Sequence, residues 1–308
     1  MNKKLIYGLM ATAMMLTSAC SSEEPVVQEG DTLVTFTVEL PAQLQGRTYG
    51  DGHTAKKLEY QVYDHNGNVL GDLKDNGNVV FADGELTKQV SLRLANSRSY
   101  TIICWAAAND VNVPYTFNRA EQTISADYSN VTANSDLYDA FFGKAEFTVS
   151  GPVSTTIELR RPFAQINIGA TDITEAASAG WTTTETQVTV NRVYSKFNLN
   201  TGAVVGDYGP VTYKYAAKPT TPETFPVSGV DYQAMVYVLT APTQNLVTVD
   251  FDAVSGVGST VLNRSYSNVP VQRNFRTNIY GNILTDQADI TVEIKPDFQT
   301  PDNSVVIP

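Results

Sequence analysis

The chain has 308 residues, of which 17% are charged and 42% hydrophobic, and its formal net charge is -11. The acidic balance opposes nucleic-acid binding, which relies on Lys and Arg to neutralise phosphates. Two His and two Cys are too few for a zinc ribbon or a disulfide framework. The low charge favours exposed β-structure over helix, and the length predicts two domains.

Residues 1–19 have the layout of a secretory signal peptide. Two lysines give a positive start, an apolar run extends from Leu5 to Leu16, and small residues lead to Cys20. A cysteine directly after small residues resembles a bacterial lipobox, so we expect Cys20 to carry a lipid. The alternatives are an ordinary signal peptide or a membrane helix, for which the apolar run is shorter than the roughly 20 residues needed.

Residues 20–31 form an acidic linker after this cysteine. The run Ser21-Ser22-Glu23-Glu24 resembles the surface-export signal of Bacteroidetes lipoproteins, and a plain solvated linker is the alternative. Removal of residues 1–19 takes away two lysines and no acids, which leaves 19 basic and 32 acidic residues and a net charge of -13.

Alternation of hydrophobic and polar residues dominates the mature chain, and this is the pattern of strands with one buried face. The first such segment is 32–40, in which one face carries Val34, Phe36, Val38 and Leu40. The pattern recurs at 86–94, 145–149, 164–168, 188–190, 247–251 and 290–294. It predicts an all-β protein whose antiparallel sheets stack as sandwiches, with one short helix at most, at 171–180.

The first basic residue of the mature chain is Arg47, which follows the first strand in a Gly-containing stretch that we expect to be exposed. A trypsin-like cut between Arg47 and Thr48 would separate the lipid anchor and the strand 32–40 from the rest. Burial of the four apolar side chains of that strand stabilises the fold by roughly 6–12 kcal/mol, at about 1.5–3 kcal/mol each. A strand from another chain that refilled the groove would recover this free energy.

The expected domain boundary lies near 151–162, where Arg161-Pro162-Phe163 separates two strand patterns. The N-terminal sandwich would then cover residues 32–151 and the C-terminal sandwich residues 152–296. Residues 297–308 remain as a tail.

Candidates for chemistry are sparse. His53 and His65 lie in loops without a Ser or Cys partner in sequence, and Cys104 sits in an apolar run that predicts a buried thiol. Carboxylates such as Asp172 and Glu175 do not form a recognisable acid and base pair. We therefore expect no catalytic residues, no cofactor and no enzyme activity.

The segment beginning at Asp64 resembles the start of a calcium loop, with Asn66 and Asn68 at the following ligand positions. Val69 occupies the place of the required glycine, and Asn66-Gly67 explains the segment as a hairpin turn, so we expect no metal. The chain has 16 tyrosines, which fit either a glycan-stacking platform or sheet packing. Packing is favoured, because several fall within expected strands: Tyr60, Tyr63, Tyr213, Tyr215 and Tyr237.

Two longer motifs carry a family resemblance. Leu159-Arg160-Arg161-Pro162-Phe163-Ala164-Gln165-Ile166-Asn167-Ile168 is similar to the strand that opens the second domain of Bacteroidetes fimbrillins, the type V pilins. The stretch from Val269 to Asn282 is similar to a late segment of fimbrillin-like proteins. Other features also fit this family: the lipoprotein start, the early strand, the lone arginine and the two-domain all-β chain. The resemblance therefore covers nearly all of residues 20–296.

The resemblance implies two tandem transthyretin-like sandwiches and a fimbrial (pilus) subunit at the outer membrane and cell surface. It further implies cleavage by an arginine-specific protease, strand exchange with other pilus subunits, and a role in adhesion. The donor strand would come from the C-terminus, as Val305, Val306 and Ile307, or as residues 289–295 freed with them.

Other interpretations remain open at this point. The chain fits a stalk subunit, a tip or accessory subunit, or an uncleaved anchor that never donates a strand. A monomeric surface lipoprotein that binds glycans is an alternative from another class. The receptor is not readable from the sequence.

Overall fold

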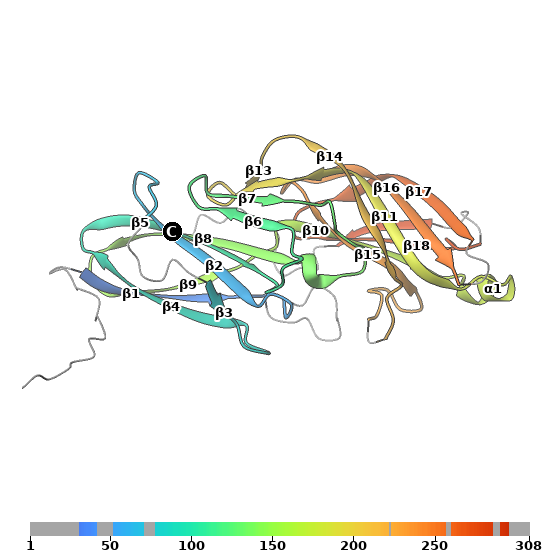
Figure 1. Cartoon of the computed structure of the whole chain (residues 1–308), viewed down its shortest axis with the longest axis horizontal. Helices are drawn as coiled ribbons and strands as arrows, with labels where there is room; N and C mark the ends of the chain where they lie inside the picture. Colours follow the sequence, from blue (N-terminus) through green and yellow to red (C-terminus); the bar gives the residue numbers. More distant parts are fainter. Residues whose placement is uncertain are drawn as a thin grey trace, which may run out of the picture.

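The computed structural model describes residues 31–41, 52–70, 78–221, 223–256, 260–285 and 290–295. These residues are almost entirely β-structure, which confirms the predicted all-β class, and they form an elongated molecule (Figure 1). The expected short helix is present as α1 (Ile173–Ser178), and a single turn of 3-10 helix spans Asp136–Tyr138. No helix in this part of the chain is long and apolar enough to cross a membrane.

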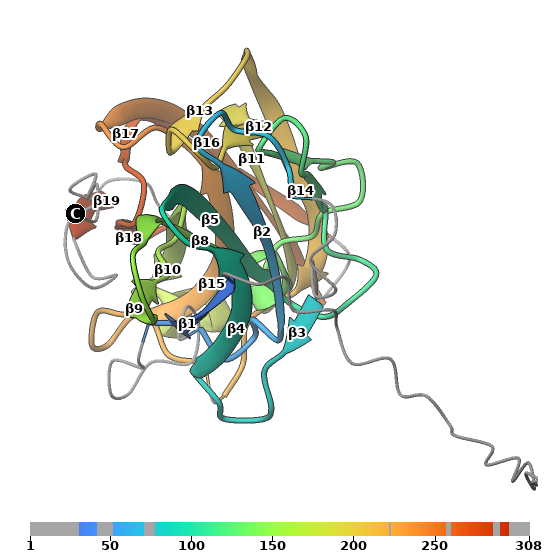
Figure 2. The same cartoon turned by 90° about the vertical axis from the view of Figure 1, so that its left-hand side faces the viewer.

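The first sandwich lies at one end of the molecule, and Figure 2 views the molecule from that end. One of its sheets has the order β4-β1-β9, with β4 (Thr87–Ala95), β1 (Asp31–Glu39) and β9 (Val153–Glu158). The facing sheet has the order β3-β2-β5-β8, with β3 (Asn78–Val80), β2 (Lys57–Asp64), β5 (Arg98–Ala107) and β8 (Ala140–Val149).

The second sandwich occupies the other end (Figure 1). Its first sheet contains β15 (Asp231–Leu239), β10 (Phe163–Ala170), β18 (Arg276–Gly281) and β19 (Ile290–Lys295) in this order. Its second sheet contains β14 (Tyr208–Ala217), β11 (Thr183–Tyr194), β16 (Asn245–Ser255) and β17 (Val261–Val271). Two strand pairs, β1 with β9 and β10 with β18, run parallel.

A small sheet joins the two sequence halves. It contains β13 (Ala203–Val204), β12 (Lys196–Asn198), β7 (Thr123–Ala126) and β6 (Tyr115–Asn118). Several residues that precede 151, among them Ile124, Val131 and Tyr138, pack into the core of the second sandwich. The chain passes from β9 to β10 within the expected boundary 151–162. Because residues from both halves of the sequence pack into one core, the division into two domains at this boundary stays a prediction.

Strand β5 contributes to both hydrophobic cores. Ile102 and Cys104 face the first core, whereas Ile103 and Trp105 face the second. Successive side chains of a strand point to opposite faces, so the sheet β3-β2-β5-β8 is covered on both sides along β5. The two sandwiches therefore share a layer.

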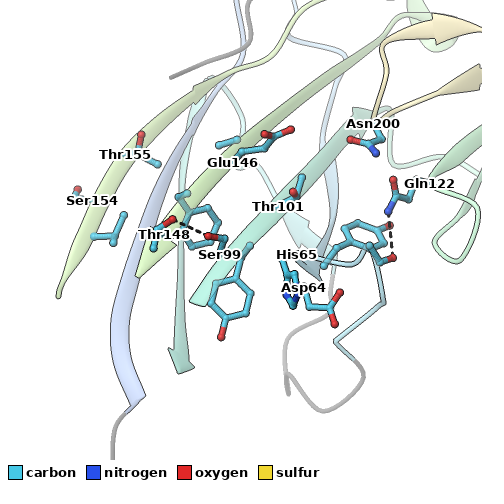
Figure 3. Close-up of a pocket in the computed structure, with 16 residues that line it drawn as sticks. Asp64, His65, Ser99, Thr101, Gln122, Glu146, Thr148, Ser154, Thr155 and Asn200 are labelled. Atoms are coloured by element: carbon cyan, nitrogen blue, oxygen red, sulfur yellow. Dashed lines mark hydrogen bonds between the residues drawn. The ribbon is translucent and has the colours of Figure 1, made fainter. Parts of the chain in front are cut away.

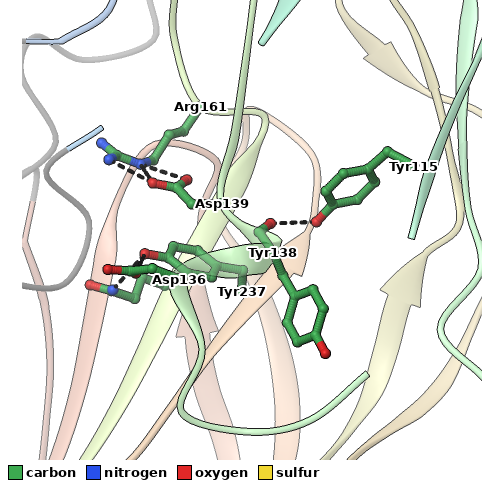
Figure 4. A network of polar contacts seen from close by, with 7 residues as sticks. Tyr115, Asp136, Tyr138, Asp139, Arg161 and Tyr237 are labelled. Atoms are coloured by element: carbon green, nitrogen blue, oxygen red, sulfur yellow. Dashed lines mark hydrogen bonds and ion pairs between the residues drawn. The ribbon is translucent and has the colours of Figure 1, made fainter. Parts of the chain in front are cut away.

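A buried ion pair fixes the start of β8 to the passage between β9 and β10 (Figure 4). The Arg161 guanidinium donates from Nε to both carboxylate oxygens of Asp139 at 2.9 Å and from Nη2 to Oδ2 at 2.8 Å, and both side chains are 2% exposed. The guanidinium carbon also lies 4.4 Å from the centre of the Phe141 ring. Burial opposes the charge of Arg161, but the Asp139 carboxylate, together with Tyr237 and Asp136, outweighs this effect and the net pKa of Arg161 is raised.

Phe142, which follows Phe141 in β8, contacts a second arginine, Arg273, on the opposite face of the strand. The guanidinium of Arg273 lies 5.5 Å from the Phe142 ring and 5.6 Å from the Phe197 ring of β12. The two rings meet edge to face at 4.7 Å. Consecutive phenylalanines of one strand thus carry an arginine on each side, which ties β8 to the second sandwich.

Replacement of Arg161 by Met tests the weight of this ion pair. We expect the single variant to lose about 3–5 kcal/mol of unfolding free energy, because Asp139 is left as an uncompensated buried charge. The double variant Arg161→Met/Asp139→Leu should recover most of the loss. The exposed pair Lys196–Glu121, at 2.7 Å, is the control, because Lys196→Met should cost less than about 1 kcal/mol. Urea unfolding measures all three, and equal losses in the single and double variants would contradict the interpretation.

Candidate functional site

The candidate site is β1 together with the groove that it fills. Its side chains alternate as the sequence predicts, so that Val34, Phe36 and Val38 are fully buried and Leu40, just beyond the strand, is 5% exposed. The opposite face is more open, with Leu33 47% exposed. The β-branched and aromatic residues of this segment suit a half-buried pleated strand.

Both backbone edges of β1 are paired. On one side, β4 runs antiparallel over the whole strand, from Asp31 opposite Ala95 to Glu39 opposite Thr87. On the other side, β9 runs parallel, from Val34 beside Val153 to Glu39 beside Glu158. The ladders continue past the strand end, where Leu40 N donates to Leu86 O and Leu159 N donates to Glu39 O, each at 2.8 Å. β1 is therefore the central strand of its sheet.

The buried face of β1 packs on the facing sheet. Phe36 meets Phe147 of β8 edge to face, with ring centres 5.0 Å apart, and Phe147 stacks on Tyr100 of β5 at 5.8 Å. Removal of β1 from this position would leave an apolar floor, and unpaired backbone groups would remain on both β4 and β9.

The chain leaves β1 and returns at nearly the same point. An added Cβ at Gly52 would lie 3.2 Å from the carbonyl oxygen of Pro41, and Gly52 has a φ of +81°, which favours glycine. The ten residues between them, including Arg47 and Thr48, lie outside the described residues. The same holds for Cys20 and for the expected donor residues Val305, Val306 and Ile307, so the structure leaves those predictions as they stand.

The carboxylates of Asp64 and Asp172, which the sequence offered as candidates for chemistry, have structural roles. The Asp64 carboxylate accepts hydrogen bonds from Asn66 N at 2.9 Å and Asn68 N at 2.8 Å, which is the geometry of a turn. Asp172 accepts from the backbone N–H groups of Leu284 and Thr285 and so holds the chain after β18. Among the described residues, no group of three His, Cys, Asp or Glu side chains is placed to bind a metal.

Most of the tyrosines considered for glycan stacking are core residues. Tyr60, Tyr63, Tyr213 and Tyr237 are each at most 2% exposed, whereas Tyr215 is 39% exposed. The Tyr63 and Tyr213 hydroxyl groups donate to backbone carbonyl oxygens, those of Arg119 and Tyr237, whereas the Tyr237 hydroxyl donates to the Asp136 carboxylate. Packing is thus the role that the structure shows for the buried four.

Two features of the site escape sequence reasoning. The parallel pairing of β1 with β9 joins residues far apart in the chain, and no local pattern encodes it. A hollow of about 820 Å³ lies beside β8 and β9 and extends over the outer face of β5 (Figure 3). Its lining is mainly polar, which no single segment reveals.

Comparison with known proteins gives a family first. The sequence pattern of a family of unknown function (DUF6562) matches residues 26–308. The chain belongs to this family. None of the curated proteins compared with the chain matches it.

Solved structures share the fold at low sequence identity. A proposed cell adhesion protein from Bacteroides ovatus is 14% identical, over 86% of this chain and 98% of its own, with a TM-score of 0.51. A proposed adhesin from Bacteroides thetaiotaomicron is 10% identical, over 88% and 98%, with a TM-score of 0.54. A fimbrial anchor protein from Porphyromonas gingivalis is 12% identical, over 86% and 98%, with a TM-score of 0.44. The two structures with TM-scores of 0.51 and 0.54 confirm the all-β fold that the resemblance implies.

Truncation of Phe36 tests how much the fold depends on β1. We expect Phe36→Ala to lower the unfolding free energy by about 3–5 kcal/mol, because a fully buried ring is replaced by a cavity. Leu33→Ala, on the exposed face of the same strand, is the matched control and should change it by no more than about 0.5 kcal/mol. Chemical denaturation of both variants measures the difference, and comparable small effects would show that β1 is dispensable.

Thiol reactivity tests the buried position of Cys104. This side chain is fully buried, and its burial raises the pKa of the thiol to about 12, so almost no reactive thiolate is present at neutral pH. We expect iodoacetamide to leave Cys104 unmodified in the folded protein and to modify it fully in guanidinium. Peptide mass spectrometry measures both, and rapid alkylation of the folded protein would contradict the core assignment.

Proposed function

We propose that this protein is a structural subunit of a cell-surface fimbria that serves adhesion. It is exported as a lipoprotein through Cys20, matured by cleavage after Arg47 and assembled by donor-strand exchange. The observation that carries the proposal is β1, an N-terminal strand whose core-facing side chains are fully buried and whose two edges are both paired. The adhesion names of two fold neighbours agree with a role in adhesion.

The described residues that flank the segment with Arg47 support the maturation step. Pro41 and Gly52 lie next to each other. A cut after Arg47 then breaks the covalent link to β1 without removing its contacts. The strand stays bound until a competing strand replaces it, so the apolar groove is not exposed to water.

The C-terminal end supports the donor step. β19 pairs only with β18 among the described strands, and its Val292 is 39% exposed. An edge strand with so little burial leaves its sheet at much smaller cost than β1 leaves its own. Residues 290–295, together with Val305, Val306 and Ile307, are therefore the segment we assign as donor.

Partners follow from this assembly. Other pilus subunits occupy the groove and receive the donor strand, an arginine-specific protease cuts the segment, and the lipid on Cys20 holds the precursor on the outer membrane. The role is structural, with no enzyme activity assigned. A tip subunit or an uncleaved anchor is the related alternative, and the N-terminus of the mature protein separates them.

Replacement of Arg47 by Ala tests the proposal in the native cell. We expect the wild-type surface protein to begin at Thr48 and to form high-order ladders on gels. The Arg47→Ala protein should keep residues 20–47 and stay monomeric, because the bond that tethers β1 is no longer cut. Arg93→Ala, on the exposed face of β4, is the control and should be processed normally. Terminal peptide mass spectrometry and gel electrophoresis measure both properties.

A native protein that begins at Cys20 and retains residues 20–47 would overturn the stalk assignment and favour the anchor. Cleavage of Arg47→Ala at the same position would show that another residue directs the protease.

A further inference from the structure

Strands β8 and β9 follow each other in the chain but are joined only at one end. Phe142 N donates to Arg160 O and Arg160 N donates to Phe142 O, each at 2.8 Å, and this is an isolated antiparallel bridge. Close approach there requires Gly143, because an added Cβ would lie 2.8 Å from Leu159 Cδ2. Between this bridge and the turn after Val149, no ladder connects the two described strands.

The alternation of the ladders tells which backbone groups face this opening. Leu159 N bonds to β1, whereas Arg160 bonds to β8, so successive residues of β9 face opposite sides. Ser154, Thr156 and Glu158 therefore point their N–H and C=O groups away from β1. By the same alternation from Phe142, the residues of β8 that face the opening are Lys144, Glu146 and Thr148.

The opening coincides with the hollow of about 820 Å³ (Figure 3). In that view, Ser154 and Thr155 of β9 lie on one side and Glu146 and Thr148 of β8 on the other. Phe147 and Val153 also line the hollow and supply an apolar surface. The space thus has polar backbone edges on two sides and an apolar contact between them.

Other described sheet edges are protected against added strands by the usual devices. Strands β3, β6 and β13 are short. The edge of β15 is covered by Asn134, and the edge of β14 is covered by the segment around Val131. Strands β4, β17 and β19 carry Lys, Arg or Pro residues. β9 has none of these from Val153 to Ile157, where the residues are Val, Ser, Thr, Thr and Ile, whereas the facing edge of β8 carries Lys144 and Glu146, which pair with each other at 2.9 Å. A regular, β-branched, uncharged edge is a template for strand pairing.

We propose that the opening between β8 and β9 is a docking site for one extended segment of another polypeptide chain. The segment pairs with the free edges of both strands and closes the first sandwich on this side. It is independent of β1 and of the fimbrial assembly proposed above. The turn Asp64–Gly67 and Asn200 also line the hollow.

The lining also sets the chemistry of this segment. Among the described residues that line the hollow, Asp64 and Glu146 carry carboxylates, and Lys144 beside the hollow forms an ion pair with Glu146 at 2.9 Å. Hydrogen bonds from Asn68 lower the pKa of Asp64, so this carboxylate is charged at neutral pH. The docking segment therefore carries small or β-branched apolar residues on the side that faces Phe147 and one basic residue on the outer side, next to Asp64.

A capped heptapeptide, Lys-Thr-Val-Thr-Val-Thr-Val, is the probe, and amide hydrogen exchange of the full chain is the readout. In the protein alone, the amides of Glu146, Thr148, Ser154 and Thr156 should exchange at least tenfold faster than those of Thr155 and Ile157, which face β1. Saturating peptide should slow the exchange of the first group at least fivefold. The same peptide with alternate N-methylated residues should have no effect, because its donors are blocked.

Proline substitution supplies a matched pair of variants. Thr156→Pro removes an N–H that faces the opening, and proline is tolerated where an edge N–H has no ladder partner, so the variant should fold and bind the peptide at least tenfold more weakly. Gln89→Pro makes the same change on β4, at the opposite free edge of the same sheet, and should leave binding unchanged.

Two results would overturn the proposal. One is slow exchange of the Glu146, Thr148, Ser154 and Thr156 amides in the free protein. Slow exchange would mean that β8 and β9 form a hydrogen-bonded ladder with each other or are covered by another part of the chain. The other is the absence of peptide-induced protection in the wild-type protein, or protection that the N-methylated peptide reproduces. The peptide comparison needs no variant and remains decisive if Thr156→Pro fails to fold.

Discussion

The position of β1 between β4 and β9 is the constraint on which the first sandwich depends. Its inward side chains are fully buried, and among the described strands β4 and β9 each pair with β1 alone in this sheet. A sheet of three strands cannot lose its middle member and keep either its ladder or its core. Some strand must therefore occupy this place at all times, whether it belongs to the same chain or to another.

The two sandwiches are also connected, so a structural change in the first sandwich affects the packing of the second. β5 serves both cores with alternate residues, and the start of β8 is held by Arg161 on one face and Arg273 on the other. Arg161 directly follows the segment that extends the β1–β9 ladder. The two sandwiches are thus packed as one body, and the chain between β9 and β10 is a fixed corner.

The sequence predicts the parts of this structure that depend on local patterns. Alternation placed Val34, Phe36 and Val38 on one face, the run around Cys104 indicated burial, and the single helix lies within 171–180. Long-range pairing escaped prediction, because nothing near Val34 identifies Val153 as its neighbour. The Arg161–Asp139 pair was missed for a related reason, since an arginine beside another arginine and a proline reads as surface charge until its partner is known.

The direction of the β1 ladders has a mechanical consequence. A force applied along β1 acts parallel to the strand, and the hydrogen bonds to β4 and β9 lie across it. Under such a load the bonds on both edges resist together in shear, instead of opening one after another as in a peeled hairpin. A strand held in this way withstands tension far better than its length suggests, and the same holds for any strand that takes its place.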